Sequence, residues 1–151
     1  MNPFWLALIS VTPFIELRGA IPLGIAAGLD PGLVFMASVV PNILLIPVLF
    51  LLLDLVFKHV VFKMPRLGNV IEKQMERARK KAEPYVKKYG FVGLALFVAI
   101  PLPLTGAWTG SFGAYVLKMK RAEAIASIAF GVFIAGSIVM LASVGIIGLV
   151  I

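Results

Sequence analysis

The chain has 151 residues, 61% of them hydrophobic and only 14% charged, with a formal net charge of +7. A typical soluble domain carries about 25% charged residues and keeps roughly a third of its unfolded surface in contact with water, so a soluble globule is excluded and a membrane protein is predicted. The absence of cysteine and the single histidine exclude disulfides, thiolate metal sites and most imidazole chemistry, and we expect no cofactor and no metal.

Residues 1–29 are apolar except for Glu16 and Arg18, and two prolines, Pro13 and Pro22, interrupt them. Because proline removes a backbone donor and clashes with the preceding turn, the pattern predicts two short helical arms that form a re-entrant hairpin. Placing an ionisable side chain in lipid costs free energy, so each such residue is a candidate functional residue. We expect Glu16 to bind a proton and Arg18 to attract an anionic group such as phosphate. The alternative is a structural ion pair in which the two charges only neutralise each other.

Residues 31–57 carry no charge before Asp54 and exceed the about 18 apolar residues that mark a membrane segment, which predicts a transmembrane helix. Ten of the fourteen basic residues follow between Lys58 and Lys88. Apolar residues recur there at steps of three and four, which predicts an amphipathic helix over residues 64–89. Positive charge stays on the cytoplasmic side of membranes, so we expect this helix at the cytoplasmic surface and no nucleic-acid partner.

The uncharged run at residues 89–117 would extend about 43 Å as one helix, against a hydrocarbon core of about 30 Å. A second re-entrant hairpin over residues 90–117 is therefore predicted, and it places the basic cluster Lys118–Arg121 in the cytoplasm as well. Two prolines and two glycines mark the expected break in this hairpin: Pro101, Pro103, Gly106 and Gly110.

Three side chains beside this break are candidates for the opposite wall of the site. We expect Thr105, Thr109 and Trp108 to complete a substrate or proton site with Glu16 and Arg18. Hydroxyl groups can bind polar parts of a substrate, and an indole ring can contact its apolar part. The alternative for these residues is packing within the hairpin without substrate contact.

Residues 122–151 form the last apolar run and predict a second transmembrane helix. Sliding the sequence by 88 residues lays Pro13 on Pro101 and the first long apolar run on the last. Each half is then a hairpin followed by a spanning helix, and the halves have opposite orientations because the amphipathic helix between them stays on one side. We predict an all-α integral membrane protein of two inverted halves, which is the design of many secondary transporters.

Two segments, TPFIELRGAIP at residues 12–22 and FVAIPLPLTGAWTG at residues 97–110, resemble those of the small multidrug export protein family. That family in turn looks like a remote branch of the DedA and VTT-domain superfamily. The resemblance implies two opposed re-entrant hairpins with spanning helices, and movement of lipids or polyprenyl-phosphate carriers across bilayers. DedA proteins place arginines in the second hairpin, and residues 90–117 contain none.

The leading functional hypothesis is a transporter in the cell membrane, proton-coupled, that moves an amphiphilic or lipid-like substrate between the two hairpins. No Ser-His-Asp set, phosphate-binding glycine loop or metal-ligand cluster is present, so we do not expect an enzyme. Two complete spans enclose little volume, which favours a homodimer surrounded by membrane lipids. The alternatives are a four-span proton-coupled exporter of small molecules or drugs, and an assembly factor whose basic helix docks a partner or anionic lipid.

Overall fold

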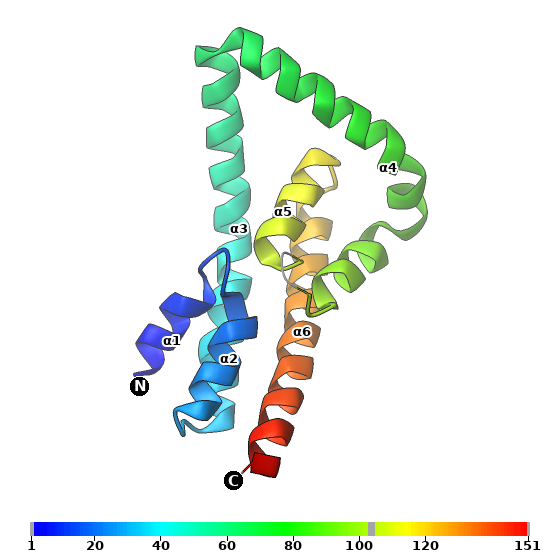
Figure 1. Ribbon diagram of the computed structural model, residues 1–151. Helices are drawn as coiled ribbons and strands as arrows, with labels where there is room; N and C mark the ends of the chain where they lie inside the picture. Colours follow the sequence, from blue (N-terminus) through cyan, green and yellow to red (C-terminus); the bar gives the residue numbers. More distant parts are fainter. Residues whose placement is uncertain (1, 103–104, 151) are drawn as a thin grey trace.

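The computed structural model describes residues 2–102 and 105–150, and in these ranges the chain is helical without strands. Figure 1 shows two long, nearly straight helices, α3 (Pro31–Lys63) and α6 (Arg121–Val150), with three short helices packed along them and a long, bent helix, α4 (Pro65–Ala99), that leaves the end of α3 and returns to α6. Both chain ends lie at the same end of the molecule. The short helices are α1 (Pro3–Ser10), α2 (Glu16–Ala26) and α5 (Ala107–Val116).

The helices α3 and α6 are the two elements long and apolar enough to cross a membrane among the described residues. Their 33 and 30 residues correspond to about 50 and 45 Å, beyond the about 30 Å of hydrocarbon. Only 28% and 39% of their most apolar stretches are buried inside the protein, so most of these side chains face outward. An outward apolar surface of this extent is the lipid-facing surface of a membrane protein.

Small residues let α2, α3 and α6 approach closely. A Cβ at Gly24 would lie 2.7 Å from Val34 Cγ2, and a Cβ at Gly136 would lie 2.6 Å from Val39 Cγ2. Both distances are shorter than side chains tolerate, so these two positions require glycine for packing. Close approach of this kind is the usual way in which helices associate in lipid.

The first two helices are short. Asn2 caps the start of α1: its side chain accepts a hydrogen bond from the Phe4 backbone N–H, and Pro3 is the first residue of the helix. α1 and α2 extend about 12 and 16 Å, well short of the hydrocarbon thickness. The prediction that Pro22 breaks the chain is wrong, because α2 continues through it. A proline leaves one backbone carbonyl of a helix without its hydrogen bond, and in lipid neighbouring groups can satisfy that carbonyl.

α4 joins the basic segment and the next apolar arm in one helix, rather than ending near residue 89. It starts beside the end of α3, bends part-way along, and its second half returns to α6 (Figure 1). The Ser127 hydroxyl donates to the Phe91 carbonyl at this contact. A Cβ at Gly131 would lie 2.7 Å from the Ala95 carbonyl oxygen, so glycine is again required.

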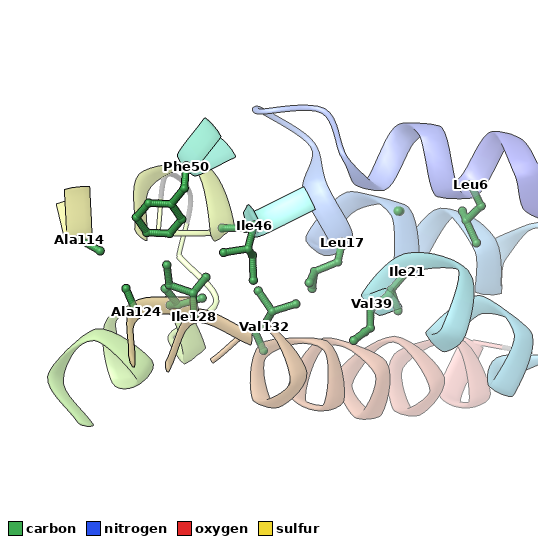
Figure 2. Packing of buried hydrophobic residues seen from close by; sticks show 14 of the residues in the cluster. Leu6, Leu17, Ile21, Val39, Ile46, Phe50, Ala114, Ala124, Ile128 and Val132 are labelled. Carbon is green, nitrogen blue, oxygen red and sulfur yellow. The ribbon is translucent and has the colours of Figure 1, made fainter. Parts of the chain in front are cut away.

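The buried core follows the line along which α2, α3 and α6 meet (Figure 2). Leu17 and Ile21 of α2, Ile46 of α3 and Val132 of α6 are at most 3% exposed. Val98, at the end of α4, belongs to the same cluster and is fully buried. The core therefore fixes the end of α4 against the start of α2, which is where the polar side chains gather.

Candidate functional site

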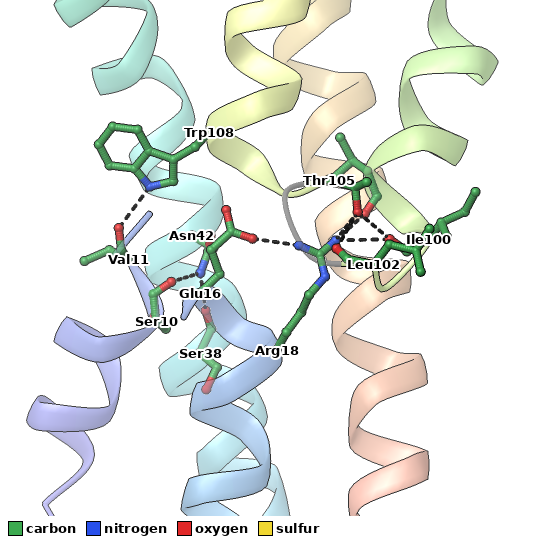
Figure 3. Close-up of polar contacts among 11 residues, drawn as sticks. Ser10, Val11, Glu16, Arg18, Ser38, Asn42, Ile100, Leu102, Thr105 and Trp108 are labelled. Atoms are coloured by element: carbon green, nitrogen blue, oxygen red, sulfur yellow. Dashed lines mark hydrogen bonds and ion pairs between the residues drawn. The ribbon is translucent and has the colours of Figure 1, made fainter. Parts of the chain in front are cut away.

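The candidate site lies where the turn between α1 and α2 faces the segment between α4 and α5 (Figure 3). Arg18, in α2, reaches across this junction. Its Nη2 donates to the Val98 carbonyl at 3.1 Å, to the Ile100 carbonyl at 3.2 Å and to the Thr105 hydroxyl oxygen at 3.1 Å. The last carbonyls of a helix have no partner within it, so the guanidinium satisfies the C-terminal end of α4 and complements its dipole.

Glu16, the first residue of α2, binds both Arg18 and the start of α5. Arg18 Nη1 lies 2.7 Å from Glu16 Oε2, and the two side chains are only 15% and 8% exposed. The Glu16 carboxylate also lies directly against Gly106, the residue that precedes α5. α5 begins after Gly106, which has no side chain to cap it. Glu16 therefore places a negative charge at the N-terminal end of α5, where the helix dipole favours it.

The backbone at Glu16 is unusual. Its φ of +49° lies in the left-handed region, which residues other than glycine rarely adopt. Such a conformation persists only where the surrounding contacts determine it. The ion pair with Arg18 and the contact with α5 supply those contacts, and they direct the carboxylate away from α1 toward the opposite helix pair.

Side chains from two other helices, α5 and α3, cap the turn between α1 and α2. Trp108 Nε1, on α5, donates to the Val11 carbonyl at 3.1 Å. Asn42 Nδ2, on α3, donates to the Ser10 carbonyl. Ser10 is the last residue of α1 and Val11 follows it, so both carbonyls would otherwise lack partners. Side chains from the α1–α2 pair thus cap the break between α4 and α5, and a side chain from α5 helps to cap the turn of the α1–α2 pair.

Several buried polar atoms have no hydrogen-bond partner. Among the described residues, the buried atoms without a hydrogen-bond partner are Arg18 Nε, Ser38 Oγ, Asn42 Oδ1 and Ser111 Oγ. A cavity of about 320 Å³ lies beside the ion pair, lined by the α1–α2 turn, Arg18 and Pro101. No group of three or more His, Asp or Glu side chains in the described part of the chain could hold a metal ion.

Four of the five predicted site residues meet at this junction: Glu16, Arg18, Thr105 and Trp108, the last through its bond to the Val11 carbonyl. Thr109 does not join them; it is exposed and lines an apolar groove between α4 and α5. Asn42 is the member that sequence reasoning missed, and its only sequence signal is a polar residue inside a long apolar run.

The predicted break points divide into three groups. Pro13 lies in the turn between α1 and α2, and Pro101 and Gly106 lie between α4 and α5. Gly110 is wrong as a break, because α5 runs through it; a Cβ there would lie 2.6 Å from Val98 Cγ2, so its role is close packing on α4. Pro103 falls outside the described residues.

Comparison with known families places the chain. The family model described as "Putative small multi-drug export protein" matches residues 16–138, from Glu16 through most of α6. The chain belongs to this family. The matched residues of this small multi-drug export family protein include Glu16, Arg18 and the partners of Arg18 at the α4–α5 break. A relationship to DedA proteins stays a prediction. No curated protein and no solved structure matches the chain significantly.

Proposed function

We propose that the protein is a membrane transporter for an amphiphilic, lipid-like substrate, in which α1–α2 and the α4–α5 break act as two re-entrant hairpins. The observation that carries the proposal is the Glu16–Arg18 junction, where two interrupted segments meet and each supplies caps for the other. Interrupted helices that meet inside the membrane are the binding elements of many transporters. Membership in an export protein family supports the same function.

Charge supports an orientation in the cell membrane. The basic first half of α4 lies at the same end of the molecule as the turn between α5 and α6 (Figure 1). Arg79 Nε of α4 donates to the Val116 carbonyl, and Arg121 pairs with Asp54 at 2.7 Å. The positive-inside rule places this end in the cytoplasm. The α4–α5 hairpin then enters from the cytoplasm, and the α1–α2 hairpin enters from the outside.

The junction suggests how a proton and a substrate are coupled. Protonation of Glu16 would remove the negative charge that holds Arg18 and caps α5. An anionic group on a substrate would then compete with the α4 carbonyls for the freed guanidinium, since charge-assisted hydrogen bonds are stronger than those to neutral oxygens. The two hairpins would separate at the point where they are now joined. Glu16 is the proton site and Arg18 the substrate site in this mechanism.

The proposal is tested with purified protein in phosphatidylcholine vesicles. Transfer of a fluorescent phospholipid between leaflets is followed by dithionite quenching, with and without a pH gradient. We expect Glu16→Gln to abolish the response to the gradient, and Arg18→Lys to slow transfer by about tenfold, equal to 1.4 kcal/mol in barrier height. Glu123→Gln, an exposed carboxylate at the start of α6, is the matched control. An unchanged response to the pH gradient in a folded Glu16→Gln protein would refute the mechanism.

The family description favours a second candidate substrate, a small drug-like molecule. The same vesicles test it when the phospholipid is replaced by an amphiphilic fluorescent dye. Dye movement without phospholipid movement would support small-molecule export. A homodimer remains part of the proposal, and native mass spectrometry in mild detergent tests it, because a monomer alone would contradict it.

A further inference from the structure

A second cavity lies apart from the Glu16–Arg18 junction, between the last turns of α3, the first half of α4 and the turn from α5 to α6. Its volume is about 970 Å³, within the range of about 300–1,000 Å³ that is usual for small-molecule pockets. Apolar side chains make up much of its lining: Phe50, Phe57, Val61, Phe62, Ile71 and Met75. Nothing in the proposed transport mechanism uses this space.

The amphipathic half of α4 turns part of its apolar stripe toward this cavity. Ile71 and Met75 line it, one turn apart, and both are only partly buried. An amphipathic helix normally buries such a stripe against protein or lipid. On the opposite wall, Phe57 stacks against Tyr115, with ring centroids 5.1 Å apart. The cavity therefore offers an apolar interior between a helix stripe and an aromatic wall.

Basic side chains outnumber acidic ones in the lining. Lys58, Arg79, Lys118 and Arg121 line the cavity together with Asp54 and Glu72. Arg121 already pairs with Asp54 at 2.7 Å, and Arg79 pairs with Glu76 at 3.2 Å. Lys58 and Lys118 are exposed, and in the described part of the chain neither forms an ion pair. Two free ammonium groups thus border an apolar space.

We propose that this cavity binds a single-chain anionic amphiphile, such as a long-chain fatty acid from the cytoplasmic leaflet. The carboxylate pairs with Lys58 and Lys118, and the chain lies between Ile71, Met75 and the aromatic wall. A cavity at the upper end of the range for small-molecule sites suits one acyl chain better than the two chains of a phospholipid. The proposal does not depend on transport at the Glu16–Arg18 junction, so the two can fail separately.

The test uses the full chain in phosphatidylcholine nanodiscs and a palmitate analogue with a photoactivatable diazirine on its chain. After irradiation, labelled peptides are mapped by mass spectrometry. We expect saturable labelling at residues 57–75, displaced by palmitate but not by hexadecanol or hexadecyltrimethylammonium at equal membrane mole fraction. Displacement by hexadecanol as effectively as by palmitate would overturn the role of the charge. Equal displacement by phosphatidic acid would overturn the preference for a single chain.

Two pairs of variants locate the site. Lys58→Ala combined with Lys118→Ala should lower labelling by about tenfold, because a charge-assisted pair is lost. Lys63→Ala combined with Lys120→Ala removes the same charge from exposed positions outside the cavity lining and should change little. Met75→Trp should block labelling by filling the space, whereas Leu67→Trp, on an exposed position outside the lining, should not. Labelling spread over the outward faces of α3 and α6 in all variants would overturn the proposal.

Discussion

Gly106 lies directly against the Glu16 carboxylate, so closely that a Cβ at residue 106 would overlap it. The two residues are 90 positions apart in the sequence and belong to different halves of the chain. The contact gives a reason for glycine at this position. It leaves room for the charge of Glu16 at the start of α5, where a larger residue would force the two hairpins apart.

Gly106→Ala should destabilise the protein by about 1–3 kcal/mol, the usual cost of overpacking a filled site. The added methyl group must displace Glu16, and with it the ion pair to Arg18. Thermal unfolding in detergent measures the effect. Gly113→Ala is the matched control, because Gly113 lies in α5, which begins directly after Gly106, and a Cβ there meets nothing within 4 Å. It should be neutral or stabilising by up to about 1 kcal/mol, and equal losses in both variants would contradict this explanation.

Arg18→Ala should cost about 3–5 kcal/mol, because it leaves the buried Glu16 carboxylate without its charged partner. Adding Glu16→Gln to this variant should recover part of the loss, since no unpaired charge then remains. Denaturant unfolding of both single variants and of the double variant forms a complete cycle, with an expected coupling of about 0.5–3 kcal/mol. Strictly additive losses would show that the pair does not act as a unit.

Arg18→Lys keeps the charge but removes the planar fork that reaches Glu16 and the oxygens of the α4–α5 break together. An ammonium group cannot hold this arrangement, so the variant should fall between wild type and Arg18→Ala in stability. The same unfolding measurement orders the three proteins. Wild-type stability for the lysine variant would show that charge alone maintains the junction.

Trp108→Phe should cost about 1 kcal/mol, because it removes the donor to the Val11 carbonyl and keeps most of the ring. Trp5→Phe is the control, since Trp5 is 60% exposed on α1 and should tolerate the change. Thermal unfolding of both proteins under the same conditions makes the comparison. A larger loss at residue 5 than at residue 108 would contradict the capping role of Trp108.

The sequence predicts the elements whose formation depends on hydropathy and length. The long uncharged runs predict α3 and α6, because spanning a membrane needs about 20 apolar residues. The pattern of prolines places the turn at Pro13 and the break at Pro101 correctly. Helix boundaries are less predictable. α3 continues to Lys63, because outside the hydrocarbon a helix can continue through charged residues. α4 continues from the charged segment into the apolar arm as far as Ala99, because a change in hydropathy does not by itself end a helix.

The partners within the site could not be read from the sequence in the same way. The cost of charge in lipid singles out Glu16 and Arg18. Their partners on the opposite hairpin include carbonyl groups of Val98 and Ile100, and every residue has a carbonyl, so no residue type marks them. The predicted break at Pro22 is wrong because a proline inside a helix cannot be told from a proline at a break in a single sequence.

The central claim is that two hairpins enter the membrane from opposite faces and meet at the Glu16–Arg18 junction. Because the natural chain lacks cysteine, single cysteines at Asp30, Lys63 and Lys118 can be labelled with a membrane-impermeant maleimide from each side of sealed vesicles. The account predicts that positions 63 and 118 react from the cytoplasmic side and position 30 from the outside. Reaction of position 118 from the outside would show that the α4–α5 segment crosses completely, and would contradict the account.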